Sequence, residues 1–215
     1  PSGDPAPGGA LLAADELAPL GAAHDDDDVA FAVDGAEQQQ PGAGETGGDR
    51  DLAARQIGDQ RVAVGYQQLM EVFAKDAISV EEGDMLTLYT GWGDMILSMG
   101  GDPDAEKLHQ SCAVLDGYDP KLLQWITDSG VSVIVSDNMA VESSHGDGDT
   151  QGGRSHLPIH RHCLFRLGVH LGELWNLGEL ASALRRQNRF RYLLTAPPLR
   201  MPGAVGSPAN PIGTV

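Results

Sequence analysis

Residues 160–173 read His-Arg-His-Cys-Leu-Phe-Arg-Leu-Gly-Val-His-Leu-Gly-Glu. The first part of this stretch predicts a helix over 160–167, and Gly168 predicts the left-handed residue that ends it. The apolar residues that follow predict a strand, so His160 and Glu173 stand at opposite ends of a helix–strand unit. Imidazole and carboxylate are ligand types that hold a zinc- or manganese-like ion. The stretch therefore predicts an α/β unit that carries two candidate metal ligands.

The same alternation of helices and short strands extends over residues 51–215, which predicts one α/β domain. Asp119-Pro120 predicts a helix start, because Asp caps free N–H groups and Pro suits the first helical position. Gly130 predicts the end of that helix. The predicted elements are helices over 66–77, 120–129, 160–167 and 177–186 (the last capped by Asn176), strands over 85–90, 131–135, 169–174 and 192–196, an irregular stretch over 94–118, and a polar, glycine-rich loop over 143–155.

Residues 1–50 differ in composition from the rest of the chain. They hold eleven acidic side chains, one basic side chain and one aromatic side chain, and they are rich in Ala, Gly and Pro. Such a segment buries too little apolar surface to offset its ordering entropy, so we predict a disordered acidic segment. His24 and the four aspartates of 25–28 are interpreted as a solvated acidic run, because adjacent carboxylates repel one another.

The formal net charge of −17 argues against a nucleic-acid partner and against an anionic membrane surface. The longest apolar runs fall short of the roughly 20 residues that a membrane-spanning helix needs. The two cysteines, Cys112 and Cys163, match no metal or redox spacing and form no disulfide framework. These features predict a cytoplasmic protein.

An ordered set of sequence blocks over about 62–215 resembles the cyclase family, which includes bacterial kynurenine formamidases and isatin hydrolases. The blocks are Gly83–Trp92, Val133–Asn138 with Val141-Glu142, His160–Glu173, Leu174–Leu177, Ala196–Leu199, Gly203–Pro208 and Pro211-Ile212. The resemblance implies a swivelling β/β/α fold, a homodimer, and a metal-dependent hydrolase of a small amide or lactam. An arylformamidase-like enzyme acting on an N-formylkynurenine-type substrate is the implied example.

The resemblance also implies roles for individual residues. His160 and Glu173 match family positions that bind the metal, zinc or manganese. The other family ligands come from an upstream His-x-Gly-Thr-His-x-Asp motif, which this sequence lacks. We therefore assign no catalytic residue and interpret the chain as a fragment or an altered relative. The alternative hypothesis is a catalytically inactive or truncated cyclase-fold protein that acts as a binding or dimerisation module.

Four further residues are predicted to contribute to a substrate pocket: Trp92, Asp137, Gly206 and Ser207. Trp92 follows a strand, and Gly206 and Ser207 belong to the loop of 203–208. Asp137 ends a buried strand, where its carboxylate would hold loop backbone. Ser136-Asp137-Asn138 also matches the SDN box of penicillin-binding enzymes, but their Ser-x-x-Lys and Lys-Thr-Gly motifs are missing.

A second interpretation of the histidines stays open at this point. On an extended segment, the side chains of His156, His160 and His162 would point to one side and form a small metal site. The simpler interpretation leaves His156 and His162 facing solvent. Cys163 is interpreted as a small, packed apolar residue.

Overall fold

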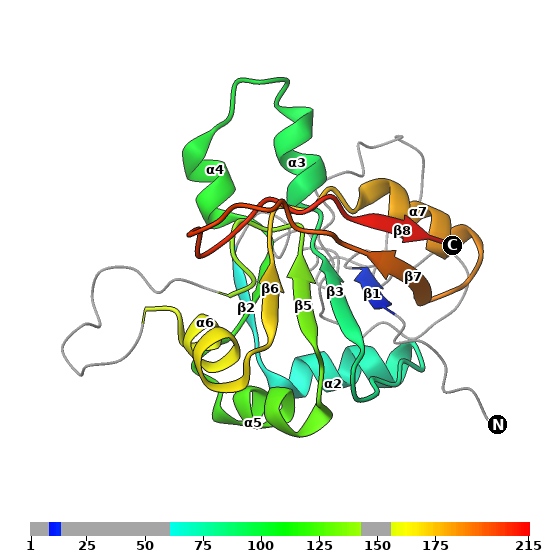
Figure 1. Cartoon of the computed structure of the whole chain (residues 1–215). Helices are drawn as coiled ribbons and strands as arrows, with labels where there is room; N and C mark the ends of the chain where they lie inside the picture. Colours follow the sequence, from blue (N-terminus) through cyan, green and yellow to red (C-terminus); the bar gives the residue numbers. More distant parts are fainter. Residues whose placement is uncertain (1–8, 14–60, 143–155) are drawn as a thin grey trace.

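The computed structural model describes residues 9–13, 61–142 and 156–215 (Figure 1). Its centre is a six-stranded sheet in the order β6-β5-β3-β1-β7-β8. The first four of these strands are mutually parallel, and β7 and β8 complete the sheet in antiparallel pairing. The strands are β1 Gly9–Ala13, β3 Met85–Tyr89, β5 Val133–Ser136, β6 His170–Gly172, β7 Arg191–Thr195 and β8 Ile212–Thr214, while β2 Val62–Val64 and β4 Ala113–Leu115 form a separate parallel pair.

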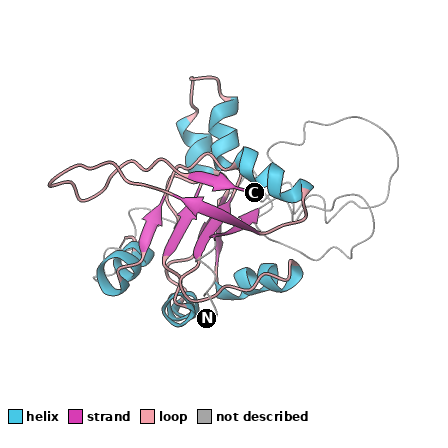
Figure 2. Ribbon diagram, turned by 45° about the vertical axis from the view of Figure 1, so that its right-hand side comes forward, coloured by secondary structure: helices cyan, strands magenta, loops and turns pink. Residues whose placement is uncertain are grey.

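Helices surround the strands, as Figure 2 shows. Two short helices, α3 and α4, stand beyond one end of the sheet, and α2 and α5 lie at the opposite end (Figure 1). None of the described helices is both long and apolar enough to cross a membrane. The helices are α2 Tyr66–Lys75, α3 Trp92–Ser98, α4 Ala105–Gln110, α5 Pro120–Ser129, α6 Pro158–His160 with the π-helix η3 Arg161–Leu167, and α7 Gly178–Arg186.

The main core forms where the sheet meets these helices. Leu86 of β3 and Ile134 of β5 are fully buried in one apolar cluster with Leu122 and Ile126 of α5. A second cluster, Tyr89, Leu177, Ala181, Leu184, Tyr192 and Leu194, joins α7 to β3 and β7. The alternation of parallel strands and helices confirms the predicted α/β class.

The predicted helix over 120–129 is confirmed with both of its ends. The Asp119 carboxylate accepts a hydrogen bond of 2.8 Å from the Lys121 N–H, and Pro120 occupies the first helical position. Gly130 ends the helix in the left-handed conformation, with φ of 68°. Local capping chemistry therefore determines this element, as the sequence indicates.

The irregular stretch predicted over 94–118 is wrong, because it contains most of α3, all of α4 and β4. These elements are too short to show a clear periodicity. Asp104 caps α4 by accepting from the Lys107 N–H at 3.1 Å, and the buried Trp92 anchors α3. The tertiary setting stabilises helices that sequence pattern alone does not reveal.

The predicted Asn176 cap is also wrong, since α7 begins one residue later and has no side-chain cap of its own. The Asp94 carboxylate of α3 lies at its start, in the space that a side chain on Gly178 would fill. Negative charge suits this end of a helix dipole.

Of the predicted acidic segment, residues 9–13 form β1. The remainder, like the predicted loop over 143–155, lies outside the described residues.

Two helix-ending glycines, Gly130 and Gly168, give a matched test of how closely Glu82 packs against the end of α5. Gly130 and Gly168 both have positive φ, so replacing either with Ala should cost about 1 kcal/mol in the free energy of unfolding. A Cβ on Gly130 would also lie 2.8 Å from Glu82 Cγ, whereas a Cβ on Gly168 would meet open space. Chemical denaturation should therefore show a larger loss for Gly130→Ala than for Gly168→Ala. Equal losses would contradict the close approach of Glu82.

Candidate functional site

The structure brings together the side chains of His160 and Glu173, which are thirteen residues apart in the sequence. His160 lies at the junction of α6 and η3, and Glu173 follows β6 directly. The Nε2 atom of His160 is 3.3 Å from Oε1 of Glu173. About a quarter of each side chain is exposed, 24% for His160 and 27% for Glu173, so solvent reaches the pair.

Glu142 holds the other face of the His160 ring. Its Oε1 atom is 2.8 Å from His160 Nδ1 and also accepts from the His160 backbone N–H at 2.8 Å. Its Oε2 atom accepts from the Ile159 N–H at 2.8 Å. The Glu142 side chain is completely buried, and these three contacts satisfy its carboxylate. The site is therefore a Glu142–His160–Glu173 chain that runs from the interior to the surface.

The backbone next to Glu142 also holds Glu173, the third member of the Glu142–His160–Glu173 chain. The Val141 N–H donates to Glu173 Oε1 at 3.0 Å. This segment is itself fixed to the end of β4, since the Leu115 N–H donates to the Val141 carbonyl at 2.9 Å. Two consecutive residues thus hold both predicted ligands. Sequence reasoning missed Glu142 because nothing local distinguishes a buried glutamate from an exposed one.

The two carboxylates change the acid–base behaviour of His160. Hydrogen bonding to Glu142, and then to Glu173, raises the pKa of His160 to about 9, against the opposing effect of burial. At neutral pH the ring is an imidazolium that bridges two carboxylates. A metal ion bound at Nε2 would displace the proton there, so metal binding would release this proton to solvent.

Asp137 lies at the end of β5 and is fully buried. Its carboxylate accepts from the Thr90 N–H, the Thr90 hydroxyl and the Gly93 N–H, at 2.8, 2.7 and 3.2 Å. Burial raises the pKa of Asp137 to about 6, although these hydrogen bonds act in the opposite direction. Asp137 therefore holds the backbone between β3 and α3, as predicted. Its part in a substrate pocket stays a prediction.

The other predicted pocket residues lie in different settings. Trp92 is buried in the core, where its Nε1–H donates to the Leu108 carbonyl at 3.0 Å. Gly206 and Ser207 are exposed in the long connection between β7 and β8 (Figure 1), and the Ser207 hydroxyl bonds to the Leu199 carbonyl at 3.0 Å. Their hydrogen bonds within the described residues do not reach the His160 side chain. The pocket roles of these three residues also stay predictions.

The alternative metal site of His156, His160 and His162 is wrong, because 158–167 is helical rather than extended. His162 instead contacts Thr127 of α5, with Nε2 and Oγ1 2.8 Å apart. In the described part of the chain, no group of three His, Cys, Asp or Glu side chains is placed to hold one ion. Cys163 is buried, which raises its pKa to about 12 and agrees with a packing role.

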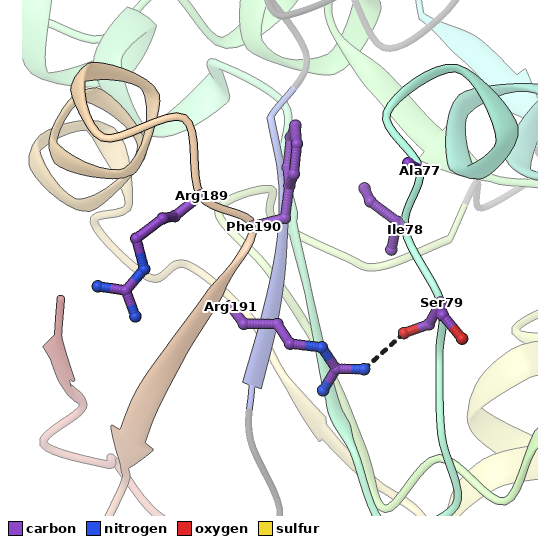
Figure 3. A pocket seen from close by; sticks show the side chains of 6 residues that line it. All are labelled: Ala77, Ile78, Ser79, Arg189, Phe190 and Arg191. Atoms are coloured by element: carbon purple, nitrogen blue, oxygen red, sulfur yellow. Dashed lines mark hydrogen bonds between the residues drawn. The ribbon is translucent and has the colours of Figure 1, made fainter.

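A surface pocket of about 270 Å³ lies elsewhere, between Ala77–Ser79 and Arg189–Arg191 (Figure 3). Figure 3 shows the Arg191 guanidinium turned toward the Ser79 backbone, whose carbonyl accepts its hydrogen bond at 2.7 Å. The same guanidinium pairs with Asp84 at 3.3 Å, so its charge is already compensated. The pocket lies at the start of β7, whereas Glu173 follows the end of β6. It does not contribute to the Glu142–His160–Glu173 chain.

The His160 contacts predict a pH-dependent stability in the presence of a chelator. The folded-state pKa of about 9 lies above the unfolded value of 6.5, so the stabilisation is complete below pH 6.5 and is lost as pH rises through 9. The difference in unfolding free energy between the wild type and His160→Gln should fall by about 3 kcal/mol over this range. Urea denaturation at several pH values measures it. Parallel stability curves for the two proteins would contradict the bridging imidazolium.

Comparison with known proteins relates this fold to a family. Residues 50–143 match the model of the Cyclase family. A solved structure described as a novel cyclase is 29% identical, with a TM-score of 0.58, over 72% of this chain and 47% of that one. Isatin hydrolase A from Ralstonia solanacearum is 17% identical, with a TM-score of 0.52, over 78% of this chain and 57% of that one. A search of curated proteins found no match.

An isatin hydrolase bound to the product analogue thioisatinate is 14% identical, with a TM-score of 0.51, over 73% of this chain and 54% of that one. This chain therefore spans about half the length of these solved structures. At such identities the isatin hydrolases show a shared fold alone. The family match includes Asp137 and Glu142 and ends before His160. The predicted resemblance is confirmed: this chain carries the fold of the cyclase family, and its residues 50–143 match that family in sequence.

Proposed function

We propose that this chain is part of a metal-dependent hydrolase of small amides or lactams. The observation that carries the proposal is the pairing of His160 Nε2 with Glu173 Oε1 at 3.3 Å, beyond the carboxyl end of a parallel strand. Ligand sites of open α/β sheets are found at this end of the strands. The family match and the shared fold with isatin hydrolases support the reaction class.

The residues present fit a divalent ion as two of its ligands. Imidazole nitrogen and carboxylate oxygen suit zinc or manganese, and a carboxylate on the other ring nitrogen is the usual support for a histidine ligand. Glu142 supplies this support to His160. A catalytic zinc ion takes three protein ligands, so the site needs at least one donor beyond the pair.

When bound, the ion would polarise the substrate carbonyl and lower the pKa of a bound water to about 7. The chain's own residues prepare this chemistry. His160 would give up its Nε2 proton to solvent on metal binding, and its ring direction is held by Glu142. Glu173 is held at Oε1 by the Val141 N–H, and its partial exposure leaves it accessible from the surface.

An N-formyl aromatic amine of the N-formylkynurenine type is the substrate we favour, with an isatin-type lactam as the second choice. Both are attacked at a carbonyl carbon next to nitrogen, so the same site chemistry serves either. Homodimer formation and a cytoplasmic location remain predictions from the sequence.

A non-catalytic binding or dimerisation module is the second candidate. It is favoured by the number of ligands, because in the described residues no third His, Cys, Asp or Glu side chain is placed to share an ion with His160 and Glu173. The two candidates differ in whether metal binding is accompanied by hydrolysis.

Metal content provides the direct test. The full chain is loaded with zinc or manganese, freed of excess ion, and analysed by mass spectrometry alongside His160→Ala and Glu173→Gln. We expect about one ion or more per wild-type chain, and less than about a tenth of that in either variant, because each removes a ligand. His162→Ala is the matched control, since His162 contacts Thr127 instead, and it should retain its metal.

Hydrolysis of N-formylkynurenine and of isatin by the loaded chain is then followed by absorbance. Turnover that disappears in His160→Ala supports the enzyme. Stoichiometric metal without turnover of either compound favours the binding module. A wild-type chain that retains no metal would overturn the proposed function.

A further inference from the structure

We infer that Glu142 is a positioning residue that determines which nitrogen of His160 faces the ligand site. Its metal-binding consequence rests on the proposed function, whereas its effect on the ring itself does not. Within the described residues, the Glu142 carboxylate bonds to His160 and to the Ile159 backbone and not to Glu173, so it acts on the exposed end of the site through His160.

The first step concerns donors and acceptors. An ionised carboxylate only accepts hydrogen bonds, so the 2.8 Å contact between Glu142 Oε1 and His160 Nδ1 places a proton on Nδ1. The opposite nitrogen, Nε2, is then the atom directed at Glu173, 3.3 Å from its Oε1. Only this ring orientation presents Nε2 as the ligand atom.

The second step concerns how firmly Glu142 is held. Both of its oxygens are engaged by backbone N–H groups, those of Ile159 and His160, at the start of the helix that carries the ring. On the other side, the Oε2 atom occupies the space that a side chain on Gly117 would need. The carboxylate is fully buried and closely surrounded, so its direction is fixed.

The third step links this carboxylate to the second ligand. Val141, the preceding residue, donates its N–H to Glu173 Oε1 at 3.0 Å. The distance between the two ligand side chains is therefore set from a single backbone segment. Removing the Glu142 carboxylate frees the His160 ring to turn while leaving the Val141 contact to Glu173 in place.

The consequence is a defined loss on substitution. Partners that orient a metal-binding histidine typically contribute 10- to 100-fold to metal affinity. Glu142→Gln keeps the size of the side chain but leaves one acceptor oxygen for three donors. We expect zinc affinity, measured by calorimetry on the full chain, to fall by roughly 10- to 100-fold.

A readout without metal separates this inference from the proposed function. In the metal-free full chain with 15N-labelled histidine, the Nδ1–H of His160 should give a proton resonance that is protected from exchange, because it donates to a buried carboxylate. Glu142→Gln should shift or lose this resonance. A purely structural role of Glu142 would lower thermal stability without moving the ring proton.

The control is Asp84→Asn. Asp84 is also a buried carboxylate that accepts from a backbone N–H, that of Glu81 at 3.0 Å, but it lies at the start of β3. It should leave both the His160 resonance and the zinc affinity unchanged. Gly117→Ala is the second test variant, because it retains the carboxylate yet crowds it, and it carries the test if Glu142→Gln does not fold.

Loss of the ring-proton resonance together with weaker zinc binding in Glu142→Gln, with Asp84→Asn unchanged, supports the inference. If the wild type binds no zinc but shows the resonance and Glu142→Gln loses it, the positioning role holds and the proposed function fails. A folded Glu142→Gln with an unchanged resonance and unchanged affinity overturns the inference.

Discussion

A buried carboxylate without access to water must have its hydrogen bonds supplied by the protein, and Glu142 imposes this constraint on its surroundings. Two backbone N–H groups at the start of α6 and one imidazole nitrogen satisfy it. The position of α6, the direction of the His160 ring and the absence of a side chain at Gly117 all follow from this requirement. The Glu142 carboxylate is buried, yet its hydrogen bonds position the surface residues at which we propose the chemistry.

The sheet explains why these residues meet. Parallel strands deliver the residues that follow them to one edge, and β5 and β6 bring Asp137 and Glu173 to that edge. The buried carboxylate of Asp137 accepts hydrogen bonds from Thr90 and Gly93 in the neighbouring turn. Two buried carboxylates near the strand ends therefore have separate tasks: Asp137 holds the turn after β3, and Glu142 holds the histidine.

Elements with strong local signals were predicted well, and elements with weak ones were not. The helix over 120–129 carries its own cap and its own left-handed end, so its bounds could be read from the sequence. The helices α3 and α4 are short, and α3 depends on the burial of Trp92. The carboxylate that lies at the start of α7 belongs to Asp94, a residue far away in the sequence. The true start of α7 could not be predicted, because the helix has no local side-chain cap and the nearby charge comes from another helix.

The sequence by itself determined the α/β class, through periodicity and capping chemistry. Its ordered blocks carried the resemblance to the cyclase family, and that resemblance singled out His160 and Glu173 as candidate ligands. Only the tertiary structure decided that the two side chains lie 3.3 Å apart, and that Glu142 rather than His156 or His162 is the partner of His160. Hydrogen bonds between distant segments have no local pattern. The difference between an exposed glutamate and one that holds the His160 ring is therefore decided by the packing of β4, α6 and β6.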